Sequence, residues 1–264
     1  MNIFFRELKA NFRSLLIWGG IASLFVFIGM SKFAAYEGNP ELVAILDSMP
    51  PAILAAFQMN AFNLTTITGF VGVMFSYFAI ILSVASTMWG TDIITKEERD
   101  KTVEFSLTMP VSRGKVITAK ILAALVNCIG LTAITWAGLM LASRSFQPDA
   151  EYYAFLQSMI LPLFIIQLIF LAVGIFLGCA MKQYKRASSA AVSILLGTFF
   201  ISIIAGLKED LNFLEYLSPF TYFSAADLLQ KSTPDLTPVL LSVGIIAVLI
   251  TGAYLTYTRR DLYI

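Results

Sequence analysis

Residues 92–120 read DIITKEERDKTVEFSLTMPVSRGKVITAK, a cluster of charged side chains between two long apolar runs. The chain has 264 residues, of which 58% are hydrophobic and only 13% are charged. Soluble domains carry about 25% charged residues. The sequence therefore predicts an all-α, polytopic membrane protein in which residues 92–120 connect two membrane-spanning helices.

Six apolar runs are long enough to cross a bilayer, which requires about 20 residues. The first run follows basic residues as in a signal peptide, but five more spans follow it, so we expect it to stay in the membrane. Pro162 is expected in the first turns of the fourth span, where proline is tolerated. Gly174 and Gly178 have the spacing that permits close helix contact. A single transmembrane domain is expected over residues 1–264, with spans at about 15–33, 65–89, 116–143, 158–181, 187–206 and 238–256.

The distribution of Lys and Arg predicts that both termini are cytoplasmic, because cytoplasmic loops carry an excess of these residues. With this orientation the outer loops hold three: Arg144, Lys208 and Lys231. The inner segments hold thirteen: Arg6, Lys9, Arg13, Lys96, Arg99, Lys101, Arg113, Lys115, Lys182, Lys185, Arg186, Arg259 and Arg260.

The segments outside the spans also contain helical patterns. Phe4, Leu8 and Phe12 recur every four residues, which fits either an amphipathic helix at the inner interface or an ordinary charged flank. Asp47 to Pro51 has the composition of a cap and first turn, so a short apolar helix is expected over 52–59. Residues 207–237 predict two short helices at the outer interface, the second over 220–229.

Several classes of function are excluded by what the sequence lacks. The chain has no histidine, which removes His-based metal sites and Ser/His or Cys/His nucleophile pairs. Cys128 and Cys179 lie in apolar runs and are expected to be small core residues. A net charge of +1 without a long basic run indicates no nucleic-acid partner. Polar span residues such as Gln167 are expected to bond between helices or to line a substrate path.

The energy for any uphill transport must come from another chain. The expected spans have no Asp, Glu, Lys or Arg near their midpoints, which argues against a proton-coupled carrier, an ion pathway and an intramembrane hydrolase. The chain also has no phosphate-binding loop of the form GxxxxGK[ST]. We therefore expect no enzymatic activity and no cofactor in this chain.

The charged stretch itself predicts a short cytoplasmic helix or, alternatively, a solvated loop. Thr95 and Glu98 have the spacing of a capping box, and Glu97 and Lys101 are four residues apart in the favourable order. Such a helix would end before Pro110. Ser112 is then a candidate cap for a further helix that becomes the third span.

The same residues resemble the permease subunits of type-2 ATP-binding-cassette (ABC) exporters. The resemblance is carried by residues 96–107 (KEERDKTVEFSL), by Pro110-Val111-Ser112-Arg113 and by Lys120, together with the six spans. The family pattern has an acidic residue followed by Gly-Thr-x-Glu, a Leu pair, Pro-Val-Ser-Arg and a Gly-Lys. This chain departs from it mildly, with Lys101 in place of the Gly, Ser106-Leu107 in place of the Leu pair and Ala119-Lys120 in place of the Gly-Lys.

This resemblance implies a membrane subunit that pairs with a second permease, identical or homologous, and docks cytoplasmic ABC ATPase subunits that bind ATP and Mg²⁺. It implies a multi-pass protein of a cell membrane, most simply a bacterial cytoplasmic membrane. A coupling helix would contact the ATPase, and Pro110, Ser112 and Arg113 would join that helix to the third span. The implied coupling residues are Lys96, Glu97, Glu98, Arg99, Lys101, Thr102, Val103, Glu104, Phe105 and Leu107.

The uncharged spans bear on the class of substrate, and the charged loop allows an alternative function. Spans without charge suit a hydrophobic or amphipathic substrate such as a peptide, lipid or drug. The alternative function is a non-transporting membrane tether or regulatory module that docks a cytoplasmic partner through the 92–110 loop. An ABC ATPase that copurifies with the chain would favour the transporter.

Overall fold

A computed structural model of the chain describes residues 3–39, 41, 44–45, 48–50, 54, 62–101, 111–207, 209–231 and 235–259. Within these residues the regular elements are all helices, and six are long and apolar enough to span a membrane. The six are α1 (Ile3–Tyr36), α4 (Ile67–Arg99), α6 (Arg113–Ala142), α7 (Ala150–Ala180), α8 (Tyr184–Ala205) and α10 (Leu236–Arg259).

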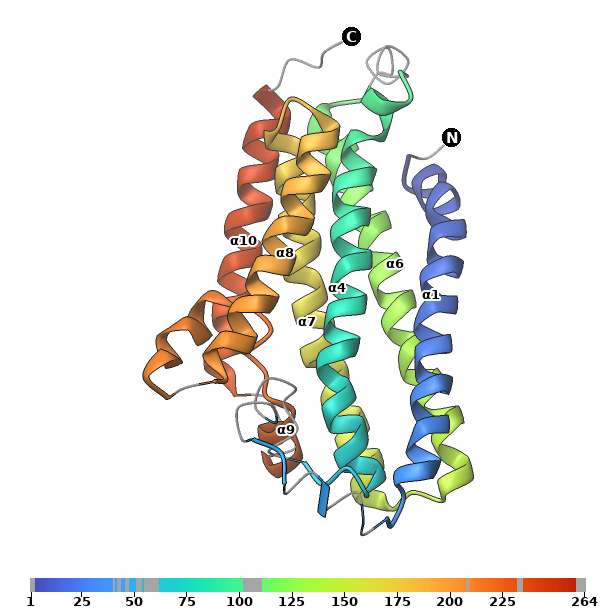
Figure 1. The fold of residues 1–264 in the computed structure, drawn as a ribbon. Coiled ribbons are helices and arrows are strands. Elements are labelled where there is room, and N and C mark those ends of the chain that lie inside the picture. The colour runs from blue at the N-terminus through green and yellow to red at the C-terminus, as the bar shows by residue number, and fades with distance from the viewer. Residues whose placement is uncertain are drawn as a thin grey trace.

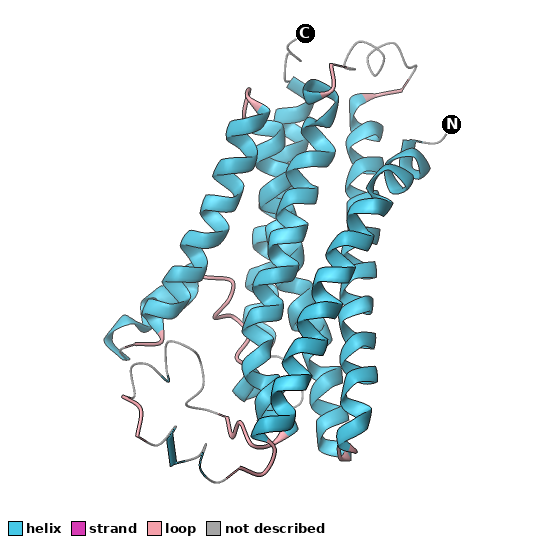
Figure 2. Cartoon of the chain, turned by 45° about the vertical axis from the view of Figure 1, so that its right-hand side comes forward, coloured by secondary structure: helices cyan, strands magenta, loops and turns pink. Residues whose placement is uncertain are grey.

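The long helices form one bundle, with both ends of the chain on the same side (Figure 1). Ile3, Arg99, Arg113 and Arg259 all lie at that side, which we call the terminal end. Figure 2 shows that the first turns of α1 incline away from the axis of the bundle. Since six spans return the chain to its starting side, this arrangement agrees with the prediction that both termini lie on one side of the membrane.

All six predicted spans are confirmed as helices, but several helices extend further than expected. Residues 3–13, expected as a separate interfacial helix or a flank, are the first turns of α1. In these turns Phe12 is exposed on the outside of the bundle, where a face directed at the membrane interface would lie, whereas Glu7 and Asn11 are buried inside the protein. The α4 helix continues ten residues past Trp89, the expected end of the second span.

The centre of the bundle is the pair α4 and α7, the two helices whose membrane-spanning parts are most buried. Their backbones meet at Gly90 and Gly174, where a Cβ on Gly174 would lie 2.5 Å from the Thr87 carbonyl oxygen. A Cβ on Gly178 would lie 3.1 Å from the side chain of Ile94. The close contact predicted from Gly174 and Gly178 is therefore confirmed, and only glycine permits the approach at residue 174.

The start of the fourth span was predicted wrongly. Residues 144–157 were expected as a loop, but η1 (Ser143–Phe146) is a short 3-10 helix and α7 already begins at Ala150. Asp149 caps α7 by accepting a hydrogen bond from the Tyr152 backbone N–H at 2.8 Å. Pro162 consequently lies inside α7 and not in its first turns, a position that packed membrane helices tolerate.

Two short helices precede the last span, as predicted. The first, η2 (Glu209–Leu217), is a 3-10 helix, and the second, α9 (Ala225–Lys231), begins after Ser224, so residues 220–224 form turns and not the expected helix. Ser218 connects this region to α8, because its hydroxyl donates to the Thr198 carbonyl at 2.8 Å. The helix expected over 52–59 lies outside the described residues.

Both cysteines, Cys128 and Cys179, are buried, as expected for small core residues.

Candidate functional site

The charged stretch begins as the last turns of α4, not as a new helix. Thr95 was expected to cap a separate helix, but it lies inside α4 and its hydroxyl donates to the Thr91 carbonyl at 2.9 Å. The helix ends at Arg99, and Lys101 has a left-handed backbone with φ of 54°. The capping box and the pairing of Glu97 with Lys101 within one helix are therefore wrong.

Lys120, on α6, is fully buried and reaches across to the end of α4. Its ammonium group donates to a carboxylate oxygen of Glu97 at 2.8 Å and to the Ile93 carbonyl at 2.5 Å. Removing a charge from water without compensation is costly, so a buried ammonium requires partners of this kind. The pair fixes α6 against α4 close to the start of the predicted coupling segment.

Glu7, on α1, completes the cluster from a third helix. Its carboxylate is fully buried and accepts hydrogen bonds from the ammonium of Lys96 and from the guanidinium of Arg6, the latter at 3.0 Å. Arg6 also donates to Glu97 at 3.3 Å. Asn11 lies one turn along α1 and donates to the Glu7 carbonyl at 3.0 Å.

Together these five side chains, Arg6, Glu7, Lys96, Glu97 and Lys120, form what we call the ion-pair network. It joins α1, α4 and α6 at the terminal end of the bundle. Three cations surround two carboxylates, so each carboxylate is compensated more than once. In such a network the loss of one member is expensive because its partners remain buried and charged.

The other predicted site residues lie around this network or beyond the described part of the chain. Arg99 is half-exposed and pairs with Asp92 and, at 3.0 Å, with Asp100. Glu98 is partly buried and Lys101 is exposed. The predicted coupling residues Thr102, Val103, Glu104, Phe105 and Leu107 and the joint residue Pro110 lie outside the described residues.

Ser112 directly precedes α6, the position predicted for its cap, but its side chain makes no capping hydrogen bond. Arg113 is the first residue of α6, and its guanidinium lies 3.5 Å from the Thr258 carbonyl at the end of α10. Further along α6, the hydroxyls of Thr118 and Tyr254 are 2.6 Å apart. The start of α6 thus contacts α10 as well as α4.

Sequence reasoning did not find Glu7 or place Lys120 in a buried contact. A signal existed for each. Glu7 is the only acidic residue before Glu37, and it stands among basic residues. Lys120 lies seven residues past the start of α6, in a stretch that is otherwise largely apolar. A lone charge in such a setting indicates a buried partner, but not which one.

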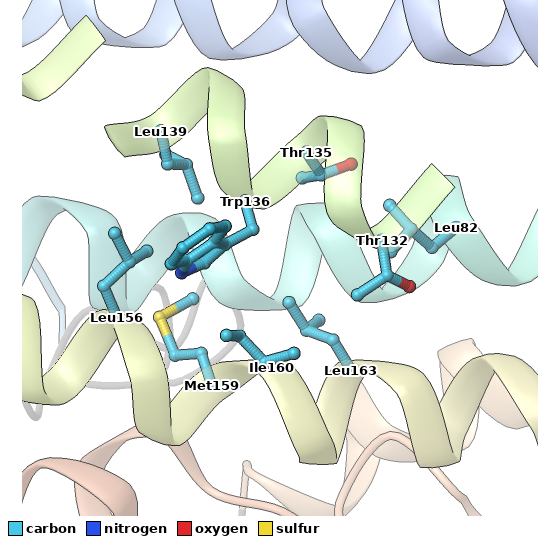
Figure 3. Close-up of a pocket in the computed structure, with 9 residues that line it drawn as sticks. All are labelled: Leu82, Thr132, Thr135, Trp136, Leu139, Leu156, Met159, Ile160 and Leu163. Carbon is cyan, nitrogen blue, oxygen red and sulfur yellow. The ribbon is translucent and has the colours of Figure 1, made fainter. Parts of the chain in front are cut away.

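A small cavity lies inside the bundle between α4, α6 and α7. The cavity there has a volume of about 10 Å³, enough for a single water molecule at most. Figure 3 shows Trp136, Met159 and Leu163 pointing into it. Next to it, the Thr132 hydroxyl donates to the Gln167 side-chain oxygen at 2.8 Å. Gln167 therefore forms a hydrogen bond between α7 and α6, which was one of the two roles expected for polar residues in the spans.

A larger cleft lies at the terminal end between α1, α4 and α8, with a volume of about 740 Å³. A second cavity, of about 410 Å³, lies near the opposite end of α1 and α4 and is lined mainly by apolar side chains, among them Phe25, Phe70 and Met74. The described residues include no group of three or more His, Cys, Asp or Glu side chains that could hold a metal ion.

A comparison with curated proteins finds no match to this chain. The family model described as "ABC-2 family transporter protein" matches residues 1–262, which is nearly the whole chain. The match agrees with the six membrane-spanning helices and with the resemblance of residues 96–120. The chain therefore belongs to the ABC-2 transporter family and is a multi-pass membrane permease subunit, whose ATPase is a separate chain.

Proposed function

We propose that the chain is the permease subunit of an ATP-driven exporter that moves a hydrophobic or amphipathic substrate out of the cytoplasm or the inner leaflet. The terminal end faces the cytoplasm, as the distribution of Lys and Arg indicates. ABC ATPase subunits, which bind ATP and Mg²⁺, dock on residues 92–110. The membrane is that of the cell, most simply a bacterial cytoplasmic membrane.

The ion-pair network is the observation that carries this proposal. Residues 102–110, which belong to the segment where the ATPase would dock, follow α4 after Asp100 and Lys101, and the last turns of α4 hold Lys96 and Glu97. Those two side chains are bonded to α1 through Glu7 and to α6 through Lys120. A force applied to the docking segment is therefore passed to three helices at once, because breaking the network would leave buried charges without partners.

Lys96 and Glu97 thus have a more specific role than the one the resemblance implied. Glu97 is buried between Arg6 and Lys120, so in this arrangement its carboxylate serves the connection between helices. Arg99, Glu98 and Lys101 lie at the end of α4 and beyond, where they flank the segment that would meet the ATPase. We propose that these residues and residues 102–107 make the contact with the ATPase.

The outer surface of the bundle suits both lipid and a second permease. Large apolar side chains point outward on the peripheral helices, for example Phe27 on α1 (54% exposed), Phe200 on α8 (60%) and Val248 on α10 (72%). Apolar side chains in this position contact lipid tails or another membrane helix. We propose that two permeases, identical or homologous, pair through part of this surface.

The test uses the chain with the ABC ATPase that copurifies with it. The double variant Glu98→Lys and Glu104→Lys is expected to lose ATPase association and nucleotide-dependent transport in proteoliposomes, while the protein remains in the membrane. Glu97 is left intact, since its replacement would also disturb the network. The matched control is Glu151→Lys, an exposed acid at the opposite end of the bundle.

If ATPase association and transport both survive in the Glu98/Glu104 variant, the docking assignment is wrong. If the wild-type pair hydrolyses ATP but transports none of the peptides, lipids and drugs screened, the non-transporting tether is the better description.

A further inference from the structure

The cleft between α1, α4 and α8 changes in character along its length. Figure 1 shows α4 between α8 and α1, and the cleft is lined by these three helices. On α4 its lining runs from Arg99 to Met88, eleven residues or about 16 Å along the helix axis. It is charged at the terminal end, through Arg99 and Asp92, and becomes apolar toward the membrane interior, through Ile17, Trp18 and Met88.

The charged end of the cleft has a positive excess. Arg13, Arg99 and Lys185 line it together with one acid, Asp92, which is paired with Arg99. Arg13 makes no ion pair with any residue that the structure describes. Hydroxyl groups of Ser188 and Ser189 lie on the same walls and can donate hydrogen bonds. This combination favours an anion with several acceptor oxygens, as in a phosphate ester.

The deep end of the cleft is open toward the lipid. Ile17 is 64% exposed and Met88 is 43% exposed, so neither is covered by another part of the described chain. The floor between them is closed by a hydrogen bond of 2.8 Å from the Trp89 indole N–H to the Ser14 hydroxyl. Apolar, uncovered walls next to a basic rim fit a molecule with a charged head and a hydrocarbon tail.

We propose that this cleft binds an anionic amphiphile of the membrane, with its phosphate-bearing headgroup between Arg13 and Lys185 and its acyl chains along Ile17 and Met88. A volume of about 740 Å³ lies within the roughly 300–1,000 Å³ usual for small-molecule sites. If the proposed export function holds, on which this step rests, the bound anionic lipid is the class of substrate that the permease moves.

The position of the cleft connects its ligand to the proposed coupling apparatus. Asn11 and Thr95 line the cleft, and Asn11 donates to the backbone carbonyl of Glu7, a member of the ion-pair network. Arg99, at the rim, is the last residue of α4 before the docking segment. A headgroup in the cleft therefore lies next to the helix end through which the ATPase would act.

The tryptophans of the chain make the proposal measurable. Of the three, Trp18 and Trp89 line the cleft, and the third, Trp136, lines the small cavity between α4, α6 and α7. The full chain carrying Trp136→Phe is reconstituted into vesicles, and its fluorescence is quenched by lipids with dibrominated acyl chains. Brominated phosphatidylglycerol is compared with phosphatidylcholine that carries the same chains.

We expect half-maximal quenching at a lower mole fraction of brominated phosphatidylglycerol than of brominated phosphatidylcholine. Arg13 and Lys185 should each contribute a factor of roughly five to this ratio. The variants Arg13→Gln and Lys185→Gln should each lose about that factor, and the double variant should show no preference. The matched control is Lys9→Gln with Lys182→Gln, which removes two exposed basic charges, one on α1 and one just before α8, that do not line the cleft.

The proposal is overturned if the wild type shows no preference or if the control pair loses it as fully as the cleft pair. It is also overturned if soluble glycerol phosphate, added in excess, removes the quenching as effectively as unbrominated anionic lipid does. Circular dichroism verifies the fold of each variant. If the double variant misfolds, the two single variants still test the proposal, because each should lose its own part of the preference. The quenching assay needs neither ATPase nor nucleotide. A negative result therefore counts against lipid binding in the cleft and not against the proposed transport function.

Discussion

Replacing Glu97 by glutamine should destabilise the protein more than any change at the exposed charges nearby. The substitution leaves three cations, Arg6, Lys96 and Lys120, around the single carboxylate of Glu7. Lys120 is fully buried, and among the residues that the structure describes its remaining hydrogen-bond partner is the Ile93 carbonyl. Since removing one partner of a buried ion pair costs about 3–5 kcal/mol, Glu97→Gln should lower the free energy of unfolding by that amount.

Lys120→Met should cost less than Glu97→Gln. It removes the buried ammonium and leaves two cations, Arg6 and Lys96, facing two carboxylates, Glu7 and Glu97. The double variant should be more stable than the sum of the two single effects predicts, by about 2 kcal/mol, because neither charge then remains without its partner. The measurement is equilibrium unfolding in mixed micelles, followed by circular dichroism as the denaturing detergent increases.

The control is Asp100→Asn, which removes an exposed ion pair with Arg99. Exposed pairs contribute about 0–1 kcal/mol, so this variant should unfold almost as the wild type does. The reasoning about the network would be refuted by either of two results. One is an effect of Glu97→Gln no larger than that of Asp100→Asn, and the other is additivity of the Glu97 and Lys120 effects within about 0.5 kcal/mol.

Two further predictions concern the packing of the spans, and both use the same unfolding measurement. Gly174→Ala places a Cβ 2.5 Å from a backbone oxygen of α4 and should cost about 1–3 kcal/mol, whereas Gly197→Ala meets nothing within 4 Å and should not destabilise; equal effects would contradict the contact. Thr132→Val removes the hydroxyl that donates to Gln167 and should cost about 0.6–1.7 kcal/mol. Thr198→Val loses only a bond within its own helix and should cost less; the reverse order would contradict the interhelical role.

The number of spans was predictable because the bilayer leaves few choices. A chain in lipid must satisfy its backbone groups internally, so a long apolar run becomes a helix. Where each helix ends was harder to predict, as α4 illustrates. Lys96, Glu97 and Arg99 mark the edge of the hydrocarbon, yet they are also good helix formers, so the helix continues through them. Hydropathy locates the membrane and not the end of the helix.

The candidate site was only partly predictable. The family resemblance implied that the residues coupling the permease to its ATPase lie within 96–107. The structure adds that Lys96 and Glu97 form ion pairs with residues of other helices. Their partners, Glu7 and Lys120, lie 89 and 23 residues away along the chain. Periodicity reports on neighbours three or four residues apart, so a pairing between three separate helices requires the fold. The same limit applies to the face of α1, where Glu7 and Asn11 were the buried residues.

The contact of α4 and α7 at Gly90 and Gly174 has a mechanical consequence. Helix α4 has 33 residues and is about 50 Å long, and α7 packs against it with backbone contact around Gly90 and Gly174. Two long helices packed directly against each other resist bending more than a single helix does. The pair α4 and α7 is therefore expected to move as one rigid unit across the membrane. We expect a displacement near Arg99 to be transmitted along α4 to Ile67, where the helix begins. Movement at one surface of the bilayer is then felt at the other without any rearrangement of the core between them.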